Sequence, residues 1–296
     1  MLQFHPPGIG QVEVETSLGK MVYYTPVRPP WQVSDQQATP LLFLHNFGGG
    51  ASAYEWAKVY PAFLDDYRVM AADLIGWGAS AHPVRDYQIE DYLLTLREFI
   101  TKTCDQPVIA IASSLTGAIA LRLAIQQPPL FRALFLVCPS GFADFGQDAG
   151  RRLPPQMVGI PFLDQTIYNI GAMNELSVRN FLERFLFADA RRVTPEMVAA
   201  YLASACQANA QYAALAFLRG DLYFDLARYL SQLTLPAALV WGKQAQFTPV
   251  RLGERLASLS PRVHPLQVVE AAGVLPQLEQ AATVIGLLKS FLRSVD

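Results

Sequence analysis

How this chain folds is decided by the stretch Val108-Ile109-Ala110-Ile111-Ala112-Ser113-Ser114-Leu115-Thr116-Gly117-Ala118-Ile119-Ala120-Leu121. It begins as a continuous apolar run with β-branched residues, which is typical of a buried strand in a parallel sheet. After two serines it continues as a helix-forming segment. The stretch therefore predicts a buried strand that feeds directly into a helix, with a serine at the corner.

A serine at such a corner is a candidate nucleophile, because a sharp strand-to-helix turn exposes its hydroxyl. The pattern G-x-S-x-G describes this turn, and Ala112 to Thr116 fill its five positions with Ser114 at the centre. Centring the pattern on Ser113 would place Leu115 where the turn needs a small residue. Thr116 departs from the pattern, since it is β-branched and bulkier than glycine. A second interpretation stays open, in which the serines simply begin a buried helix.

Composition and charge narrow the class of protein. The 296 residues can bury a large core, and a fold of this size is often one domain with an insertion. Hydrophobic residues make up 52% of the chain and charged residues only 16%, so an apolar pocket or an apolar surface is expected. The net charge of −2 gives no electrostatic basis for binding nucleic acid.

The cysteines and the N-terminus favour a cytoplasmic protein. Cys104, Cys138 and Cys206 are scattered and lack the spacing of a metal site, which suits a reducing compartment. Residues 1–7 lack the basic region and apolar run of a secretory signal, and no apolar stretch is long enough to span a bilayer. We expect a cytoplasmic location, with attachment to a membrane surface as the alternative, and neither a metal nor a cofactor.

The order of the elements predicts a doubly wound α/β fold with a mostly parallel, eight-stranded sheet. Strands are expected as a hairpin at 11–16 and 21–27, and then at 41–44, 67–72, 108–113, 133–138, 236–242 and 265–270. Helices are expected at 54–64, 89–103, 114–127 and 279–292. The long segment 142–232 is expected to form only helices. We therefore divide the chain into a core, 1–141 and 233–296, and a helical cap, 142–232.

Five stretches together resemble the α/β-hydrolase superfamily. They are Leu44-His45-Asn46-Phe47-Gly48, Asp73-Leu74-Ile75-Gly76-Trp77-Gly78-Ala79-Ser80, the strand–serine–helix stretch, Val240-Trp241-Gly242 and Ala272-Gly273-Val274-Leu275-Pro276. The resemblance covers almost the whole chain and is strongest to the capped esterases, epoxide hydrolases and carbon–carbon hydrolases. More narrowly, the chain is similar to a hydrolase-like subgroup from cyanobacteria and plastids. The resemblance implies a serine, an acid and a histidine in that chain order, with an oxyanion hole.

The oxyanion hole implied by the resemblance consists of two backbone N–H groups, those of Phe47 and Leu115. Backbone donors do not depend on the side chain, so this hole can persist although Asn46 replaces the second residue of the usual His-Gly-Phe-Gly. The alternative is that the glycines at 48–50 form only a flexible turn.

The other two positions of the implied triad carry residues that cannot perform the chemistry. The acid normally follows the Trp-Gly strand, where this chain has Ala245 and no carboxylate in the loop. Some relatives place the acid after the preceding strand, which makes Asp144 the alternative acid. The histidine position is occupied by Val274, which cannot accept a proton.

The four histidines of the chain all lie at other positions. His45 belongs to the oxyanion loop, where the resemblance implies a structural part, and His82 is expected in a surface loop. His264 begins the last strand, so it should lie at the opposite end of the sheet from Val274. His5 lies in the N-terminal tail and would need an unusual path to reach the site.

A serine without an activating base is a weak nucleophile at neutral pH, so we expect Ser114 to be weak or inert. The first hypothesis is therefore a non-catalytic protein that binds an apolar small molecule, a lipid or a partner protein. Asn46, Met157 and Phe162 are expected to line the ligand pocket. The apolar residues of the cap could equally pack on the sheet.

Two other hypotheses stay open. The chain could hydrolyse esters or lipids with an unconventional base, for which Asp144 and Glu270 are candidates, or by substrate-assisted chemistry. The base must come within hydrogen-bond reach of Ser114. The narrower resemblance also allows an assembly or scaffold protein of photosynthetic membranes.

Overall fold

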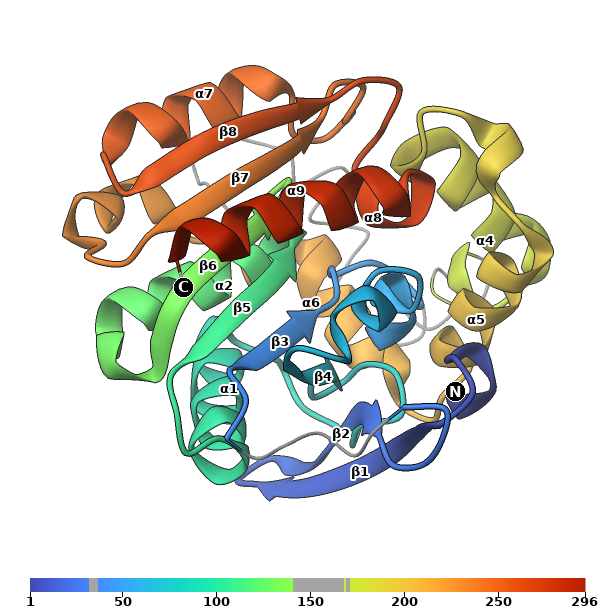
Figure 1. Cartoon of the computed structure of the whole chain (residues 1–296). Coiled ribbons are helices and arrows are strands. Elements are labelled where there is room, and N and C mark those ends of the chain that lie inside the picture. The colour runs from blue at the N-terminus through green and yellow to red at the C-terminus, as the bar shows by residue number, and fades with distance from the viewer. Residues whose placement is uncertain (32–36, 141–167, 169–170, 296) are drawn as a thin grey trace.

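The computed structural model describes residues 1–31, 37–140, 168 and 171–295. An eight-stranded sheet with the order β1-β2-β4-β3-β5-β6-β7-β8 runs through them (Figure 1). Its strands are β1 (Ile9–Thr16), β2 (Gly19–Pro26), β3 (Pro40–Leu44), β4 (Arg68–Asp73), β5 (Val108–Ser113), β6 (Phe131–Val137), β7 (Ala237–Gly242) and β8 (Val263–Val269). The predicted α/β fold with a mostly parallel sheet is confirmed.

The strands after the N-terminal hairpin end at one edge of the sheet. β1 and β2 pair antiparallel, as do β2 and β4, whereas all other neighbouring strands pair parallel. Parallel strands place their carboxyl ends together, and the loops that follow them are where open α/β sheets build binding sites. The loops after β3, β5, β6, β7 and β8 therefore meet at one edge.

Helices cover both faces of the sheet. α1 (Ile89–Thr103) and α2 (Ser114–Gln126) lie behind the sheet in Figure 1, and α9 (Ala281–Val295) crosses in front of it. Both α2 and α9 contact β6, so this strand is covered on both sides. Such double burial explains why the central strands are continuous apolar runs rather than alternating ones.

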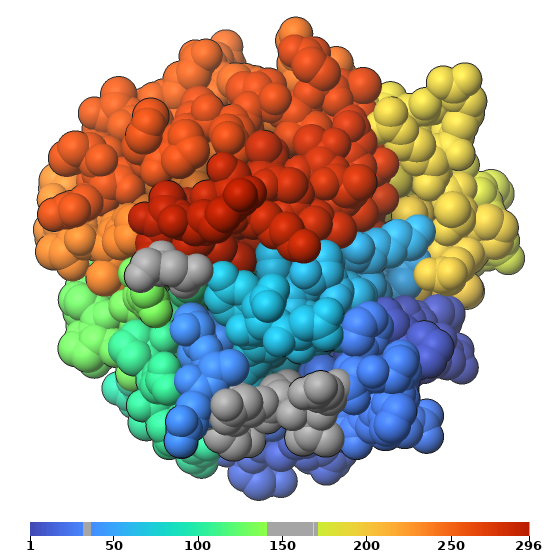
Figure 2. Space-filling model, viewed as in Figure 1, coloured from blue at the N-terminus to red at the C-terminus, as the bar shows by residue number. Residues whose placement is uncertain are grey.

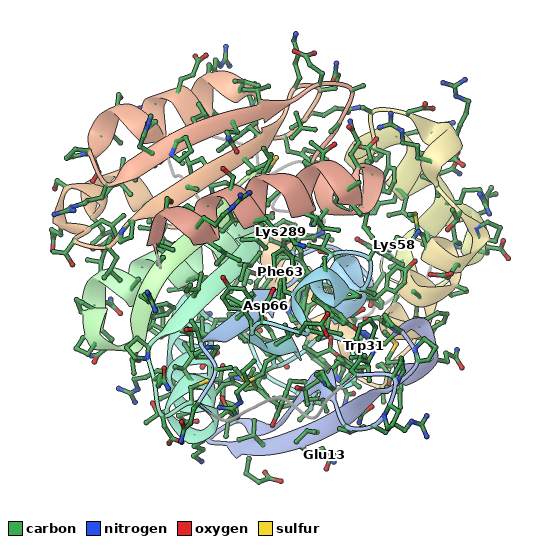
Figure 3. The ribbon with its side chains drawn as sticks, viewed as in Figure 1. Glu13, Trp31, Lys58, Phe63, Asp66 and Lys289 are labelled. Carbon is green, nitrogen blue, oxygen red and sulfur yellow. The ribbon has the colours of Figure 1, made fainter. Side chains whose placement is uncertain are left out.

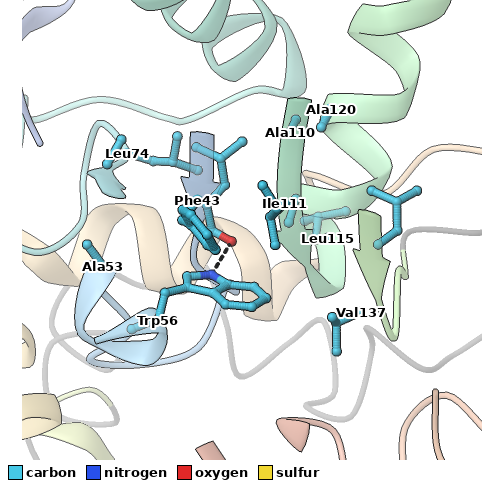
Figure 4. Close-up of a cluster of buried hydrophobic side chains, with 14 of the residues drawn as sticks. Phe43, Ala53, Trp56, Leu74, Ala110, Ile111, Leu115, Ala120 and Val137 are labelled. Carbon is cyan, nitrogen blue, oxygen red and sulfur yellow. Dashed lines mark hydrogen bonds between the residues drawn. The ribbon is translucent and has the colours of Figure 1, made fainter. Parts of the chain in front are cut away.

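The core between the sheet and the front layer is aromatic. Phe43 on β3 packs against Trp56, with ring centroids 5.5 Å apart. The indole N–H of Trp56 donates to the carbonyl oxygen of Leu44 at 2.9 Å (Figure 4). Nearer the surface of the same face, Lys289 Nζ lies 5.8 Å from the ring centroid of Phe63 (Figure 3). These contacts join α9 and the segment after β3 into one layer.

The helix predicted over 54–64 is replaced by two short 3₁₀ helices, η2 (Ala53–Trp56) and η3 (Tyr60–Phe63). Pro61 explains the difference, because proline has no N–H to donate and its ring clashes with the preceding turn of a continuous α-helix. Two further short 3₁₀ segments, η1 (Leu2–Phe4) and η4 (Pro128–Leu130), lie before β1 and before β6.

The C-terminal region differs from the prediction in three details. α7 (Val250–Leu259) is a helix that we did not predict. β8 begins two residues earlier than predicted and includes Pro265, which an edge strand tolerates because one side of it needs no ladder partner. The helix predicted over 279–292 is divided into α8 (Pro276–Glu279) and α9 by Gln280, whose φ of −141° is not helical.

The regular elements described between 168 and 232 are all helical. They are α4 (Glu175–Phe181), the π-helical turn η6 (Leu182–Leu186), η7 (Ala190–Arg192), α5 (Pro195–Ala205), α6 (Ala210–Arg219), η8 (Leu226–Arg228) and η9 (Leu230–Gln232). Figure 2 shows the yellow segment, which includes α4 and α5, packed against the blue and red parts of the core. The cap boundaries at 142 and 232 stay predictions. Asp144, Met157 and Phe162 lie outside the described residues.

Candidate functional site

The corner between β5 and α2 has the conformation of a sharp turn. β5 ends at Ser113, α2 begins at Ser114, and the φ of Ser114 is +53°. This left-handed conformation is uncommon for a residue other than glycine and is concentrated at functional sites. It lies on Ser114 rather than on Ser113, which is the position expected for a nucleophile.

The hydroxyl of Ser114 pairs with another hydroxyl. Its Oγ lies 3.3 Å from Ser140 Oγ, and the backbone N–H of Ser140 donates to the carbonyl oxygen of Ser114 at 3.1 Å. Ser140 follows β6, the neighbour of β5, so the two residues meet at adjacent strand ends. Within the described residues, neither an imidazole nor a carboxylate hydrogen-bonds to Ser114 Oγ. A serine hydroxyl is no base at neutral pH, so this contact does not activate Ser114.

Two backbone donors lie in the region predicted for the oxyanion hole. The register pairs Leu44 with Ala112, so the loop after β3 runs beside the corner. Leu115 is in the first turn of α2, whose N–H groups have no acceptor within the helix, and no side chain at the N-cap serves them. The N–H of Phe47 makes no hydrogen bond to any other described residue. The two N–H groups are therefore available to an acceptor oxygen.

His45 is part of the scaffold of this loop. Its Nδ1 donates to the carbonyl oxygen of Asn46 at 2.7 Å, and its Nε2 accepts from the N–H of Leu74 at 3.0 Å. Burial lowers the pKa of His45 to about 4, so the ring is neutral at pH 7. With both ring nitrogens engaged, His45 does not serve as a base for Ser114. This agrees with the structural part that the sequence implied.

Asn46 is buried, and its side-chain amide donates to Glu55 Oε1 at 2.7 Å. The amide of Asn46 therefore contacts η2, and its place in a ligand pocket stays a prediction. Glu55 was not predicted as part of the site. The one signal in the sequence was an acidic residue within an apolar segment, between Tyr54 and Trp56.

Ala245 and Val274, the positions where the resemblance implies an acid and a histidine, are buried and have only aliphatic side chains. Ala245 follows β7, and its N–H donates to the carbonyl oxygen of Gly242 at 3.1 Å. Val274 follows β8, and its N–H donates to the carbonyl oxygen of Leu186 at 2.8 Å. Glu270, a candidate base, forms an exposed ion pair with Lys243 instead, with 2.6 Å between the charged atoms.

Glu279 joins the loop after β8 to the cap. Its carboxylate accepts hydrogen bonds from the N–H groups of Gly273, of Ala188 at 2.8 Å and of Asp189 at 3.2 Å. Arg192 lies 3.7 Å from the same carboxylate, and burial raises the pKa of Glu279. A side chain at position 273 would collide with the carbonyl oxygen of Leu186, so a glycine permits this close approach. No pattern in the sequence marks Glu279 as an anchor.

The remaining histidines lie away from the corner. His5 stacks on Tyr24, with centroids 3.8 Å apart, and its Nδ1 lies 3.0 Å from the hydroxyl of Tyr60. His264 is exposed at the start of β8, the end of the strand opposite to Val274. His82 is half-buried rather than on the surface as predicted, and burial lowers its pKa to about 4.

Across the described ranges, no group of three or more His, Cys, Asp and Glu side chains is arranged to hold a metal ion. Cys104, Cys138 and Cys206 are free thiols, and Cys138 is buried beside Gly242 at the ends of β6 and β7. In the same part of the chain, no helix is both long enough and apolar enough to cross a membrane.

Comparison with known proteins assigns the chain to a family. The sequence model of the alpha/beta hydrolase family matches residues 41–287. An uncharacterized protein of Mycobacterium tuberculosis is 23% identical over 270 residues, which cover 86% of this chain and 76% of that protein. The 2-hydroxy-6-oxo-6-(2'-aminophenyl)hexa-2,4-dienoic acid hydrolase of Metapseudomonas resinovorans is 26% identical over 227 residues, covering 74% of this chain and 72% of the enzyme.

Solved structures agree on the fold. A meta-cleavage product hydrolase from Pseudomonas fluorescens IP01 superimposes with a TM-score of 0.76 at 19% identity, covering 98% of this chain and all of that one (100%). The positive φ at a serine between β5 and α2, the strand order and the family match over 41–287 lead to the same assignment. The chain belongs to the alpha/beta hydrolase family.

Proposed function

We propose that this protein binds an apolar small molecule through an acceptor oxygen, without hydrolysing it. The contact between Ser114 Oγ and Ser140 Oγ carries the proposal, because the group beside Ser114 is a hydroxyl and not a base. The two hydroxyls and the backbone N–H groups of Phe47 and Leu115 are the hydrogen-bond donors of this corner, and a ligand oxygen can accept from two or three of them. Such an arrangement suits a carbonyl or a carboxylate.

The replaced positions support binding rather than turnover. General-base assistance needs a proton acceptor within hydrogen-bond reach of the nucleophile, and Ala245 and Val274 offer none. Loss of triad residues lowers the rate by several orders of magnitude, while an oxyanion hole can still bind. A polar donor group at the end of an otherwise apolar pocket is the usual design of a small-molecule site.

A matched pair of ligands tests the binding step. 2-Acetonaphthone carries a carbonyl oxygen, and 2-isopropenylnaphthalene replaces that oxygen with a CH₂ group of similar shape. We expect the ketone to bind about tenfold more tightly, because only the ketone can accept hydrogen bonds from the site. Equal binding of the two ligands would contradict the acceptor-oxygen part of the proposal. Binding of neither, together with capture of a protein or of lipid vesicles, would favour the macromolecular or membrane alternative.

Hydrolysis is the second candidate function, favoured by the name of the M. resinovorans relative and by the strained conformation of Ser114. We would measure the turnover of p-nitrophenyl butyrate and p-nitrophenyl dodecanoate by the wild type and by Ser114→Ala. Equal, negligible rates are the expected result. A clear wild-type rate that Ser114→Ala abolishes would establish a serine hydrolase with a base that we have not identified.

A further inference from the structure

Glu55 on η2 has a fully buried carboxyl group whose two oxygens accept hydrogen bonds from three donors. Its Oε2 accepts from the backbone N–H of Asn46 at 2.9 Å. Its Oε1 accepts from the side-chain amide of Asn46 at 2.7 Å and from the hydroxyl of Tyr201 on α5 at 2.7 Å. Within the described residues no cation pairs with it. Burying an acid without a countercharge costs desolvation free energy, and the three converging donors offset that cost.

The hydrogen bonds on Asn46 determine the direction of the next N–H group. The carbonyl oxygen of Asn46 accepts from His45 Nδ1 at 2.7 Å, and the backbone N–H of Asn46 is held by Glu55. In a trans peptide the carbonyl of Asn46 and the N–H of Phe47 lie in one plane and point in opposite directions. Fixing that carbonyl and the preceding N–H therefore fixes the direction of the Phe47 N–H, one of the two proposed oxyanion donors.

The cap contributes to the same arrangement. Tyr201 lies on α5, and the backbone of Gly50 approaches the carbonyl oxygen of Tyr201 so closely that a Cβ at position 50 would collide with it. Because one oxygen of Glu55 serves both Tyr201 and the Asn46 amide, a movement of α5 changes what holds Asn46. The glycine loop and the cap are thus connected through a single carboxylate.

We propose that Glu55 is a positioning residue. It couples the position of α5 against η2 to the direction of the backbone N–H of Phe47. An acceptor oxygen of a ligand at the Ser114 corner is then bound tightly only while the hydroxyl of Tyr201 donates its hydrogen bond to Glu55. The inference rests on the proposed function for its ligand, but the coupling between Tyr201 and the loop is a property of the protein alone.

The chain offers a matched control. Tyr54 on η2 donates through its hydroxyl to Glu196 on α5 at 2.9 Å. Tyr201→Phe and Tyr54→Phe therefore each remove one hydroxyl and one hydrogen bond between the same two elements. Only Tyr201→Phe alters the partners of Glu55. Any difference between the two variants reports on the carboxylate rather than on general contact with the cap.

The test measures amide hydrogen exchange at 47–50 and the affinity for the two naphthalene ligands in the full-length protein. In Tyr201→Phe we expect exchange at 47–50 about tenfold faster and binding of 2-acetonaphthone about fivefold weaker, with 2-isopropenylnaphthalene within about twofold of wild type. Tyr54→Phe should change none of these. Glu55→Gln and Glu55→Ala should both weaken binding of the ketone, and Glu55→Gln less so, because its single amide oxygen can replace only one of the two carboxyl oxygens that accept from Asn46.

Each outcome decides something. Equal weakening of both ligands by Tyr201→Phe, or the same effects from Tyr54→Phe, would mean that Tyr201 has only a structural role and would overturn the coupling. If the wild type binds neither ligand, the proposed function fails, and the exchange rates alone then decide the coupling. Exchange at 47–50 that is identical in the two tyrosine variants would refute it.

Discussion

The hydroxyl oxygens of Ser114 and Ser140 lie 3.3 Å apart, at the ends of two neighbouring parallel strands. The serine of a hydrolase needs a base at this distance, and here its neighbour is a second alcohol. The remainder of the corner is intact, with a positive φ at Ser114 and a free first turn of α2. Among the described residues, the only side chain that hydrogen-bonds to Ser114 Oγ is the hydroxyl of Ser140, and the backbone N–H groups of Phe47 and Leu115 have no acceptor.

An acid at position 245 and a histidine at position 274 should give the protein hydrolytic activity. We expect the double variant Ala245→Asp/Val274→His to hydrolyse p-nitrophenyl butyrate at least ~10²-fold faster than the wild type, the usual gain from a positioned base. The same double variant with Ser114→Ala should lose the gain. Activity that persists without Ser114 would show that the new histidine acts through another route, such as direct activation of water.

Glu55 should make stability depend on pH in a definite direction. Burial raises the pKa of Glu55 to about 8 from the ordinary value of 4.5, so the folded state holds its proton more tightly than the unfolded state. This contribution is complete below pH 4.5 and is lost as the pH rises toward 8. Relative to Glu55→Gln, the wild type should therefore lose about 1 kcal/mol of unfolding free energy per pH unit between pH 5 and 8. Urea unfolding at four pH values measures this difference, and a difference that grows with pH in favour of the wild type would reverse the assignment.

Glu279 should be important for stability because its buried carboxylate satisfies three backbone N–H groups. We expect Glu279→Gln to lower the free energy of unfolding by about 2–3 kcal/mol, since an amide cannot accept from all three donors in the same geometry. Glu270→Gln is the control, because it removes only an exposed ion pair with Lys243 and should cost less than about 0.5 kcal/mol. Similar costs for the two variants would show that Glu279 is no anchor.

The buried hydroxyl of Thr116 has no hydrogen-bond partner among the residues that the structure describes. We expect Thr116→Val, which keeps the shape and removes the hydroxyl, to stabilise the protein by about 1 kcal/mol. Thr95 is equally buried, but its hydroxyl donates to the carbonyl oxygen of Asp91 at 2.8 Å. Thr95→Val should therefore destabilise by about 1 kcal/mol. Thermal unfolding of the two variants measures these opposite shifts, and a loss of stability in Thr116→Val would indicate that its hydroxyl is satisfied in solution.

The sequence predicted the sheet well because buried parallel strands are apolar along their whole length. The run at 108–113 and the two serines after it were sufficient to place β5, the corner and α2. Local composition failed where a single residue interrupts an otherwise helical pattern, as at Pro61 and Gln280. The helix α7 was missed because it lies in a polar, charged segment between two strands that had been recognised.

The contacts of the site were harder to predict than its elements. Ser140 could have been noticed, since it follows the strand next to β5. The convergence of Asn46 and Tyr201 on Glu55 joins residues up to 155 positions apart. No spacing rule along the chain connects such residues, because their proximity depends on how α5 packs against η2. Ala245 and Val274 could be located from the sequence because they follow the strands β7 and β8, and their correspondence to an acid and a histidine stays a prediction.

The loop after β8 depends on groups that every amino acid other than proline shares. The main-chain N–H of position 274 donates to the carbonyl oxygen of Leu186. The carboxyl group of Glu279 accepts from the main chain at Gly273 and at Ala188, one on each side of this contact. None of these bonds involves the side chain at 274. The side chain at 274 can therefore change while the main-chain bonds that hold this loop stay the same, so the chemistry available at 274 and the stability of the fold are independent of each other.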